Sequence, residues 1–495
     1  MQRVLRGGAI VLVLGCASAP ATPGTSDGPP AFAAVTETDL RRDLEAMAGD
    51  AMRGREAGTL DEMRASAWVA ERARAAGLEP AGDDGTFFQF WPMRRMRLAP
   101  GSRVVVGGST LTLWKDVVIT TLTEGSGELP LVFAADGAEA ESIDVRGKAV
   151  AAIVTPPTNA PAPDVSLRAW RYARAAVAER SRAFLQRGAA AVILVGDSLT
   201  DAGFDFLAAT SARGSYGLDT AGATTRPRSQ PPVMLVRRAL LPQLRAADHV
   251  AFDITAESFV YPSANVVGRI RGTDARLRDE YVLFSGHQDH DGVRFPVDGD
   301  SIWNGADDNA TTSVAMLAIA RAWKQQPGRR SALFVWHGAE ERGLLGSRWH
   351  VLHPVVPRSS IVAVLNGDML GRNNPDSASL MGVQPPHRNS SALVAMALAA
   401  NAMTGKFQLD SIWDRPTHRE GWYFRSDHLP YARANIPALF FSTNLHPDYH
   451  TPRDEPKTID VAKLARMAKW MYATGWLVAN AENRPAIDPG FKLER

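Results

Sequence analysis

The sequence predicts an α/β fold in which helices flank a mixed sheet that is mostly parallel at its centre. Between residues 256 and 485, short apolar runs typical of buried strands recur, and each is followed by a polar loop that contains glycine. Stretches with helical spacing of apolar residues, such as 313–323 and 461–471, follow some of these loops. In open α/β sheets functional groups gather beyond the carboxyl ends of the strands, so we expect functional side chains in these loops.

The first of these loops follows a predicted strand at 281–285 and contains the motif Gly-His-Gln-Asp at 286–289. His287 places an imidazole, a possible metal ligand, at the end of this strand. Asp289 is two residues further on, and we expect its carboxylate to accept the other imidazole N–H of His287. Such a pairing fixes the tautomer of a ligand histidine.

The second loop, at 304–310, carries Asp307 and Asp308 and leads into the alanine-rich stretch 313–323. Acids directly before such a stretch are typical of the capped start of a helix. Three further predicted strands end in loops that carry acids or an imidazole: Glu340 and Glu341 after 331–336, Asp368 after 360–365, and Tyr449 and His450 after 436–441.

Five side chains in these loops are candidate metal ligands: His287, Asp308, Glu341, Asp368 and His450. A single histidine or aspartate at a strand end is usually a cap or a loop hydrogen-bonding group, but five together are hard to explain in that way. Carboxylate and imidazole ligands without thiolates suit two divalent ions such as zinc, manganese or cobalt. Glu340, beside the third ligand, is then a candidate general base for a metal-bound water.

These motifs resemble the di-zinc aminopeptidases of metallopeptidase family 28, which are relatives of glutamate carboxypeptidase II. The segments that carry the resemblance are 286–289, 305–309, 339–341, 366–369 and 449–452, together with 39–90 and 265–272. The resemblance implies the fold of the zinc-dependent exopeptidases, and it covers in effect the whole mature chain.

The resemblance also implies roles for the candidate ligands. One metal would be held by His287 and Asp368 and the other by Glu341 and His450, with Asp308 bridging them. Asp308 is preferred to Asp307 because the bridging acid of the family directly precedes the asparagine position. In related enzymes the peptide bond after this acid is cis.

The same resemblance implies a mechanism. Glu340 would take a proton from the metal-bound water and pass it to the leaving amine. Tyr449 is a candidate hydrogen-bond donor to the developing oxyanion. The segment Ser-Asp-His-Leu-Pro at 426–430 is similar to a family motif, and we expect Asp427 and His428 to line the pocket or to support the ligands.

The N-terminal residues have the pattern of an export signal over residues 1–15, with Arg3 and Arg6 before an apolar core at 9–14. Cys16, the sole cysteine of the chain, stands in a segment that resembles the lipobox of bacterial lipoproteins, so it is a candidate site of lipidation. Residues 16–34 have the composition of a flexible tether. We expect an exported protein, periplasmic or anchored to the outer membrane of a bacterium, or alternatively a secreted one.

Composition limits the partners. The 495 residues include 55 basic and 53 acidic side chains, a net charge of +2 that disappears once the signal with Arg3 and Arg6 is removed. We therefore expect no nucleic-acid partner. No stretch after the signal is long enough to span a membrane, which leaves the Cys16 lipid anchor as the predicted membrane contact.

Residues 98–255 differ from the rest of the chain in their pattern of apolar runs and turns. Short β-like runs alternate with turns there, one amphipathic helix is predicted at 167–187, and no cluster of metal-type ligands follows a strand. The segments 145–150 and 187–192 resemble a protease-associated (PA) domain, which implies a lid or a wall that selects substrates. The alternative is an inert insertion. The predicted zinc peptidase domain is therefore discontinuous, with residues 35–97 and 256–485.

Together these features predict an exported di-zinc metallo-exopeptidase, an aminopeptidase that hydrolyses N-terminal residues from peptides. Three alternatives stay open. A single-zinc glutaminyl cyclase and a non-enzymatic receptor or scaffold are built on the same fold. A carboxypeptidase would use the same metals but would anchor a free carboxylate with arginines, for which the candidates are Arg342, Arg372, Arg419 and Arg425.

Overall fold

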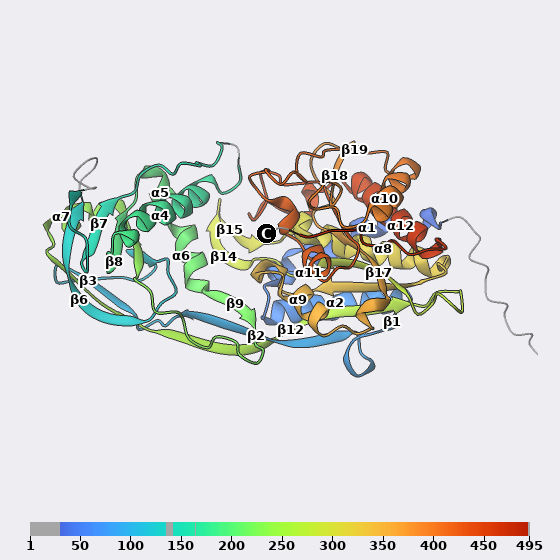
Figure 1. The fold of residues 1–495 in the computed structure, drawn as a ribbon, viewed down its shortest axis with the longest axis horizontal. Coiled ribbons are helices and arrows are strands. Elements are labelled where there is room, and N and C mark those ends of the chain that lie inside the picture. The colour runs from blue at the N-terminus through green and yellow to red at the C-terminus, as the bar shows by residue number, and fades with distance from the viewer. Residues whose placement is uncertain (1–29, 135–141, 164, 494–495) are drawn as a thin grey trace, which may run out of the picture.

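The computed structural model describes residues 30–134, 142–163 and 165–493. The predicted signal 1–15, Cys16 and most of the predicted tether lie outside these residues. The described chain is elongated, with two lobes side by side in Figure 1. Two long antiparallel strands, β2 (Phe88–Leu98) and β12 (Ala256–Ile270), run between the lobes.

The larger sheet contains ten strands among the described residues and is mixed. Its four central strands are parallel to one another in the order β20, β17, β13 and β16. Antiparallel pairs flank them on both sides. The predicted α/β class with a parallel-centred mixed sheet is confirmed. In spatial order the strands are β19 (Gln408–Leu409), β18 (Ser377–Met381), β20 (Ala438–Ser442), β17 (Ile361–Gly367), β13 (Tyr281–His287), β16 (Ser331–His337), β12, β2 and β9 (Ser215–Leu218), with β1 (Glu79–Pro80) paired to β12.

The four central strands are buried along their whole length because helices cover both faces of the sheet. Val282 and Phe284 of β13 join the core beneath α8 (Thr311–Gln325) and α12 (Val461–Asn480). Leu283 points to the opposite face, into the core that includes Tyr431 of α11 (His428–Arg433). The other helices of this lobe are α1 (Glu37–Ala48), α2 (Leu60–Ala75), α9 (Leu345–Leu352) and α10 (Ser391–Met403).

The first turn of α8 is seated against the ends of two central strands. A Cβ atom at Gly286 would lie 2.4 Å from Cγ2 of Thr312, and one at Gly367 would lie 2.7 Å from the same atom. Glycine at both positions therefore leaves room for Thr312, and the loop that precedes α8 is brought to the carboxyl ends of β13 and β17. This packing places Asp308 beside the loops that follow those strands.

The predicted tether at 16–34 was wrong at its end. Phe32–Ala34 forms a short 3₁₀ helix, and the Phe32 ring lies 5.8 Å from the ring of Tyr472 in α12. The main-chain N–H of Ala31 donates to the Tyr472 hydroxyl at 2.9 Å. Phe32, an aromatic residue in the predicted tether, supplies enough apolar surface to pack these residues onto the core.

The second lobe contains an eight-stranded sheet built from residues 103–254 of the described chain. Its helix α4 (Arg168–Gln186) agrees with the helix expected at 167–187. One strand of the segment 98–255, β9, leaves this sheet and pairs with β2 of the larger one. The strands are β4 (Ser109–Leu111), β3 (Arg103–Val106), β11 (His249–Ile254), β6 (Gly125–Ala134), β7 (Ala149–Ile153), β8 (Ala191–Val195), β10 (Val233–Val236) and β5 (Val117–Ile119), accompanied by α5 (Ser198–Ala202), α6 (Phe204–Arg213) and α7 (Leu241–Ala246).

A small hairpin, β14 (Gly292–Val297) and β15 (Asp300–Trp303), lies between the lobes near the larger sheet. Across the described ranges, no helix has the length and apolar character that a membrane crossing requires.

Candidate metal centre

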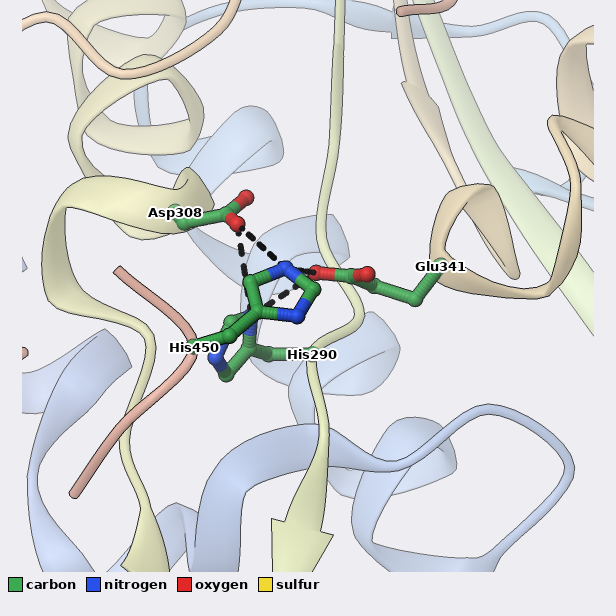
Figure 2. A group of neighbouring side chains, drawn as sticks. All are labelled: His290, Asp308, Glu341 and His450. Atoms are coloured by element: carbon green, nitrogen blue, oxygen red, sulfur yellow. Dashed lines mark ion pairs between the residues drawn. The ribbon is translucent and has the colours of Figure 1, made fainter. Parts of the chain in front are cut away.

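Side chains from five loops meet at the carboxyl ends of the central parallel strands. They form two groups, and in each group the candidate ligand atoms lie within 4.8 Å of one another. The first group contains His290, Asp308, Glu341 and His450 and is drawn in Figure 2, and the second contains His287, Glu340 and Asp368. The structure thus brings together all five predicted ligands, the predicted base and one further histidine.

Asp308 lies between the two groups. Its Oδ1 atom is 3.2 Å from Nε2 of His287, and its Oδ2 atom is 3.0 Å from Nε2 of His450. The peptide bond between Asp308 and Asn309 is cis, as the resemblance implied. Asp307 points elsewhere, since its Oδ1 accepts a hydrogen bond from Gly371 N at 2.7 Å. Of the two adjacent aspartates, only Asp308 is placed to contact ions in both groups.

Glu340 and Glu341 begin a short 3₁₀ helix, Glu340–Arg342, directly after β16. Glu341 Oε1 lies 3.1 Å from Nε2 of His450, so Glu341 belongs to the first group. Glu340 Oε2 lies 3.8 Å from Nε2 of His287, on the side of the second group. Adjacent residues therefore face different groups, which separates a ligand from a candidate base.

Asp289 has a different partner from the one expected. Nδ1 of His287 is 3.1 Å from the main-chain carbonyl oxygen of Asp289, and the nearer carboxylate oxygen is 3.8 Å away. The carboxylate instead accepts from the main-chain N–H groups of Glu340 at 3.0 Å and Glu341 at 3.3 Å. These N–H groups open a helix and have no partner within it, so they are available to donate to the carboxylate. Asp289 thus orients the two glutamates, and the His287 tautomer is set by a carbonyl.

Asp368 is held by a residue that the sequence did not single out. Its Oδ2 atom is 3.6 Å from Nε2 of His287 and accepts a hydrogen bond from the Ser426 hydroxyl at 2.7 Å. Asn366 in turn donates to Ser426 Oγ at 2.7 Å. The motif at 426–430 drew attention to Asp427 and His428, which are buried, whereas its first residue makes the contact with the ligand.

His290 is a member of the first group, although the sequence pattern did not single it out. Its Nδ1 atom lies 3.0 Å from Glu341 Oε1. The signal that could have identified it is the spacing His-Gln-Asp-His at 287–290, which repeats an imidazole within the first ligand loop.

Tyr449 lines the pocket beside the two groups. Its hydroxyl oxygen accepts from Arg425 Nη2 at 2.9 Å, and its ring centroid lies 4.0 Å from that of His450. The hydroxyl proton remains free to be donated to a ligand in the pocket. The pocket has a volume of about 270 Å³ and is lined by Asp308, Glu340, Glu341, Gly343, Leu344, Asp368, Trp422, Phe424, Arg425, Tyr449 and His450.

Unpaired polar atoms in this centre fit bound cations. Among the described residues, buried ring or carboxylate atoms without a hydrogen-bond partner include Nε2 of His287, Oε1 of Glu341 and Nε2 of His450. Buried polar groups are almost always satisfied, so a cluster of such atoms without hydrogen-bond partners is typical of a cation-binding site. The nitrogen and oxygen donor set suits zinc.

Electrostatics supports the same conclusion. Burial alone would lower the pKa of His287, but the carboxylates of Glu340 and Asp368 outweigh it and raise that pKa well above its usual range. Burial likewise opposes the rise at His450, where Glu341 and Asp308 raise the pKa to about 10. Imidazoles that retain protons so strongly lie in an excess of negative charge, which divalent cations would neutralise.

A larger cavity of about 900 Å³ opens from the centre toward the second lobe. Tyr449, His450, Arg425 and Phe424 line it on one side, and α4 of the second lobe lines it on the other. Arg171 of α4 pairs with Glu420 at 3.1 Å across this cavity. The second lobe therefore forms one wall of the approach to the candidate metal centre.

The second lobe also contacts the centre through an ion pair. Arg213, the last residue of α6, lies 2.8 Å from Oδ1 of Asp291. Oδ2 of Asp291 lies 3.4 Å from Nδ1 of His450, the ring nitrogen that points away from Asp308. Asp291 thus links the inserted segment to a candidate ligand.

Comparisons with known proteins agree with this geometry. Residues 265–475 match the model of peptidase family M28. Aminopeptidase YwaD of Bacillus subtilis is 28% identical over 190 residues, which cover 37% of this chain and 39% of that protein. A probable leucine aminopeptidase of Arthroderma benhamiae is also 28% identical, over 187 residues covering 36% of this chain and 49% of the relative. The matched region is thus less than half of each relative's length.

The fold has a counterpart among solved structures. BSAP, a zinc aminopeptidase from Bacillus subtilis, superimposes with a TM-score of 0.57 at 18% sequence identity, covering 92% of this chain and 99% of that one. At this identity the similarity concerns the fold, and it extends over both lobes.

Proposed function

We propose that this chain, whose residues 265–475 match the model of peptidase family M28, is a zinc-dependent metallo-exopeptidase that removes N-terminal residues from peptides. The observation that carries the proposal is Asp308, which faces two groups of candidate ligands at once. The names of the two aligned relatives, both aminopeptidases, support the direction of cleavage.

We assign two zinc ions to the centre, with cobalt or manganese as alternatives. His287 and Asp368 would hold one ion, Glu341 and His450 would hold the other, and Asp308 would be shared. When bound, zinc supplies a Lewis acid that polarises the scissile carbonyl and makes water more acidic.

Glu340 is the proposed general base. Its carboxylate takes a proton from the attacking water and delivers it to the leaving amine nitrogen. Asp289 keeps this side chain in position because it accepts the N–H groups of Glu340 and Glu341. The Tyr449 hydroxyl donates a hydrogen bond to the oxyanion as it forms, and Arg425, bound to the same hydroxyl oxygen, strengthens that donor.

The pocket wall formed by Leu344, Trp422 and Phe424 favours substrates with an apolar N-terminal side chain. The purified chain, loaded with zinc, is expected to release nitroaniline from leucine nitroanilide faster than from glutamate nitroanilide. One missing or mismatched apolar contact of this kind changes kcat/KM about 10- to 200-fold. Absence of release from any free-amine nitroanilide, with intact zinc content, would remove the aminopeptidase assignment.

A carboxypeptidase is the second candidate, and Arg425 is the observation that favours it. Arg425 lines the pocket beside the ligands, where it is placed to bind a substrate carboxylate. Arg342 lines a neighbouring cavity, and Arg372 is paired with Asp448 at 2.7 Å. Peptides with a blocked N-terminus and a free C-terminus distinguish the two directions, because only a carboxypeptidase releases their last residue.

Zinc content and activity distinguish the proposed peptidase from a glutaminyl cyclase and from a scaffold. A glutaminyl cyclase would bind one zinc ion and release pyroglutamate from N-terminal glutamine. A receptor or scaffold would show no turnover with any of these substrates.

The inserted segment, which we propose is a PA-like domain at 98–255, is expected to affect zinc binding through Arg213. Among the described residues, Arg213→Ala removes the one arginine of the second lobe that pairs with Asp291 beside His450; Arg294 and Arg342 pair with the same carboxylate at 2.6 Å and 3.4 Å. Loss of a supporting contact typically costs about 10- to 100-fold in metal affinity. Competition with a chromophoric chelator measures the change. Lys148→Ala is the matched control, since Lys148 pairs with the exposed Asp144 of the same lobe. Equal affinities in both variants would show that the link to Asp291 has no effect on the centre.

We also propose that residues 1–15 direct export and that Cys16 becomes a lipidated N-terminus in a periplasmic or outer-membrane-anchored protein. The support is the sequence pattern alone, since these residues lie outside the described part of the chain. The mass of the mature N-terminal peptide distinguishes a lipidated Cys16 from a plain secretory cleavage.

A further inference from the structure

We propose that His290 is an additional zinc ligand, so that one metal position has four protein ligands and the other has three. The four-ligand position contains His290, Glu341, His450 and the shared Asp308. The three-ligand position contains His287, Asp368 and the same aspartate, whose Oδ1 lies 3.2 Å from Nε2 of His287, and Glu340 of the second group is kept as the base. The four-ligand position holds its ion more tightly, and the three-ligand position is the one open to water and substrate. This inference rests on the proposed two-metal centre.

Distances between the donor atoms fit a single tetrahedral ion. Bonds of about 2.0–2.2 Å to zinc place neighbouring ligand atoms roughly 3.4 Å apart in a tetrahedron. Nδ1 of His290 is 3.0 Å from Glu341 Oε1 and 3.9 Å from Asp308 Oδ2. Nε2 of His450 is 3.1 Å and 3.0 Å from the same two atoms. In Figure 2 the four side chains converge on one point from separate loops.

His290 has no other partner that would explain its position. Its side chain is fully buried, and within the described chain neither ring nitrogen has a hydrogen-bond partner. Buried polar groups are normally satisfied, and Nδ1 of buried His350, for comparison, lies 2.8 Å from the Tyr431 hydroxyl. An ion between His290, Glu341 and Asp308 would satisfy Nδ1 directly.

The backbone around His290 makes room for the ring. Gly305 has a φ of 58°, and a Cβ atom there would lie 2.3 Å from Cγ of His290. The loop is also fixed in place, because buried Arg55 donates to the carbonyl oxygens of Gln288 at 2.7 Å and Gly305 at 2.8 Å. One guanidinium therefore ties the loop that carries His290 to the loop that carries Asp308.

The asymmetry has a chemical consequence. Zinc sites with four protein ligands are closed, whereas catalytic sites keep a position open for water or substrate. Glu340 stands beside the three-ligand position, 3.8 Å from Nε2 of His287, where the proposed base is needed. The closed position then serves to hold the shared Asp308 and to contribute charge.

X-ray absorption at the zinc edge tests the ligand count without an activity assay. The full chain loaded with two zinc ions is expected to show three imidazoles for every two ions, and His290→Ser is expected to show two. A wild-type spectrum with two imidazoles for every two ions would overturn the proposal, and this measurement needs no variant to fold.

Chelator competition tests the affinity. His290→Ser is expected to weaken the tighter ion at least about 100-fold, more than loss of a supporting contact, and to leave the weaker ion unchanged. His446→Asn is the control, because His446 is buried near Asp307 but belongs to neither group. Unchanged affinities in His290→Ser, or an equal loss in His446→Asn, would contradict the assignment. In that case, turnover by the wild-type chain with two bound ions would still support the proposed function. A wild-type chain that binds no zinc or shows no turnover would contradict the proposed function itself.

Discussion

Glu340→Gln is expected to lower kcat about 10²- to 10⁴-fold while both zinc ions remain bound. The substitution keeps the shape of the side chain but removes the carboxylate that accepts the proton from water. Zinc content should persist, because Glu341 rather than Glu340 lies within 3.1 Å of His450 Nε2 in the four-ligand group. Leucine nitroanilide turnover and zinc measured by mass spectrometry report the two effects separately.

The position of Glu340 explains why the effect should be large. It lines the pocket, and main-chain contacts to Asp289 fix the helix turn on which it stands. Burial raises its pKa well above the usual range; His287 opposes that rise, and Glu341 and Asp368 add to it. Bound cations would reverse part of this rise and favour the ionised carboxylate that acts as a base.

Glu62→Gln is the matched control for this experiment. Glu62 is fully buried, and burial raises its pKa to about 8, so glutamine imitates the protonated form. Its carboxylate accepts from the Ser263 hydroxyl at 2.6 Å, and Glu62 belongs to neither ligand group. Near-normal turnover of Glu340→Gln would show that another group moves the proton, and an equal loss in Glu62→Gln would point to a general defect.

Asp308→Ala is expected to release both ions and to reduce activity to the background rate. Asp308 is the one acid of the two groups with separate oxygens near His287 and His450, so its removal takes a ligand from each ion. Loss of a direct ligand should exceed the roughly 10- to 100-fold cost of losing a supporting contact, at both positions. Titration with zinc in the presence of a chelator measures the two affinities.

Asp307→Asn tests the choice between the adjacent aspartates. The asparagine carbonyl can still accept the hydrogen bond from Gly371 N, so the local backbone should be preserved. This variant is expected to retain both ions. Two tightly held ions in Asp308→Ala, together with their loss in Asp307→Asn, would make Asp307 the shared ligand instead.

The strands and the main helices could be predicted because their signal is local. Apolar runs at 281–285 and 331–336 became β13 and β16, and the alanine-rich stretch 313–323 became α8. The motifs likewise pointed to the five candidate ligands. Four of them lie at the end of a strand or in the loop that follows it, and Asp308 precedes a helix. The cis peptide at Asp308 was expected from family resemblance rather than from any local physical signal.

The sequence by itself therefore determined the fold class and the kinds of side chain at each strand end, because hydrophobic periodicity and glycine-bearing loops act over a few residues. The tertiary structure decided which atoms meet: the carbonyl of Asp289 rather than its carboxylate at His287, and the addition of His290 to Glu341. Some of these contacts join residues 51 positions apart, as Asp289 and Glu340 are, and others depend on the orientation of the His287 ring. Packing between loops, such as the hydrogen bonds from Arg55 to Gln288 and Gly305, sets both the distance and the orientation. Only the assembled fold specifies the distances between donor atoms. Nδ1 of His290 lies 3.0 Å from Oε1 of Glu341, and this short distance makes a loop histidine a candidate ligand.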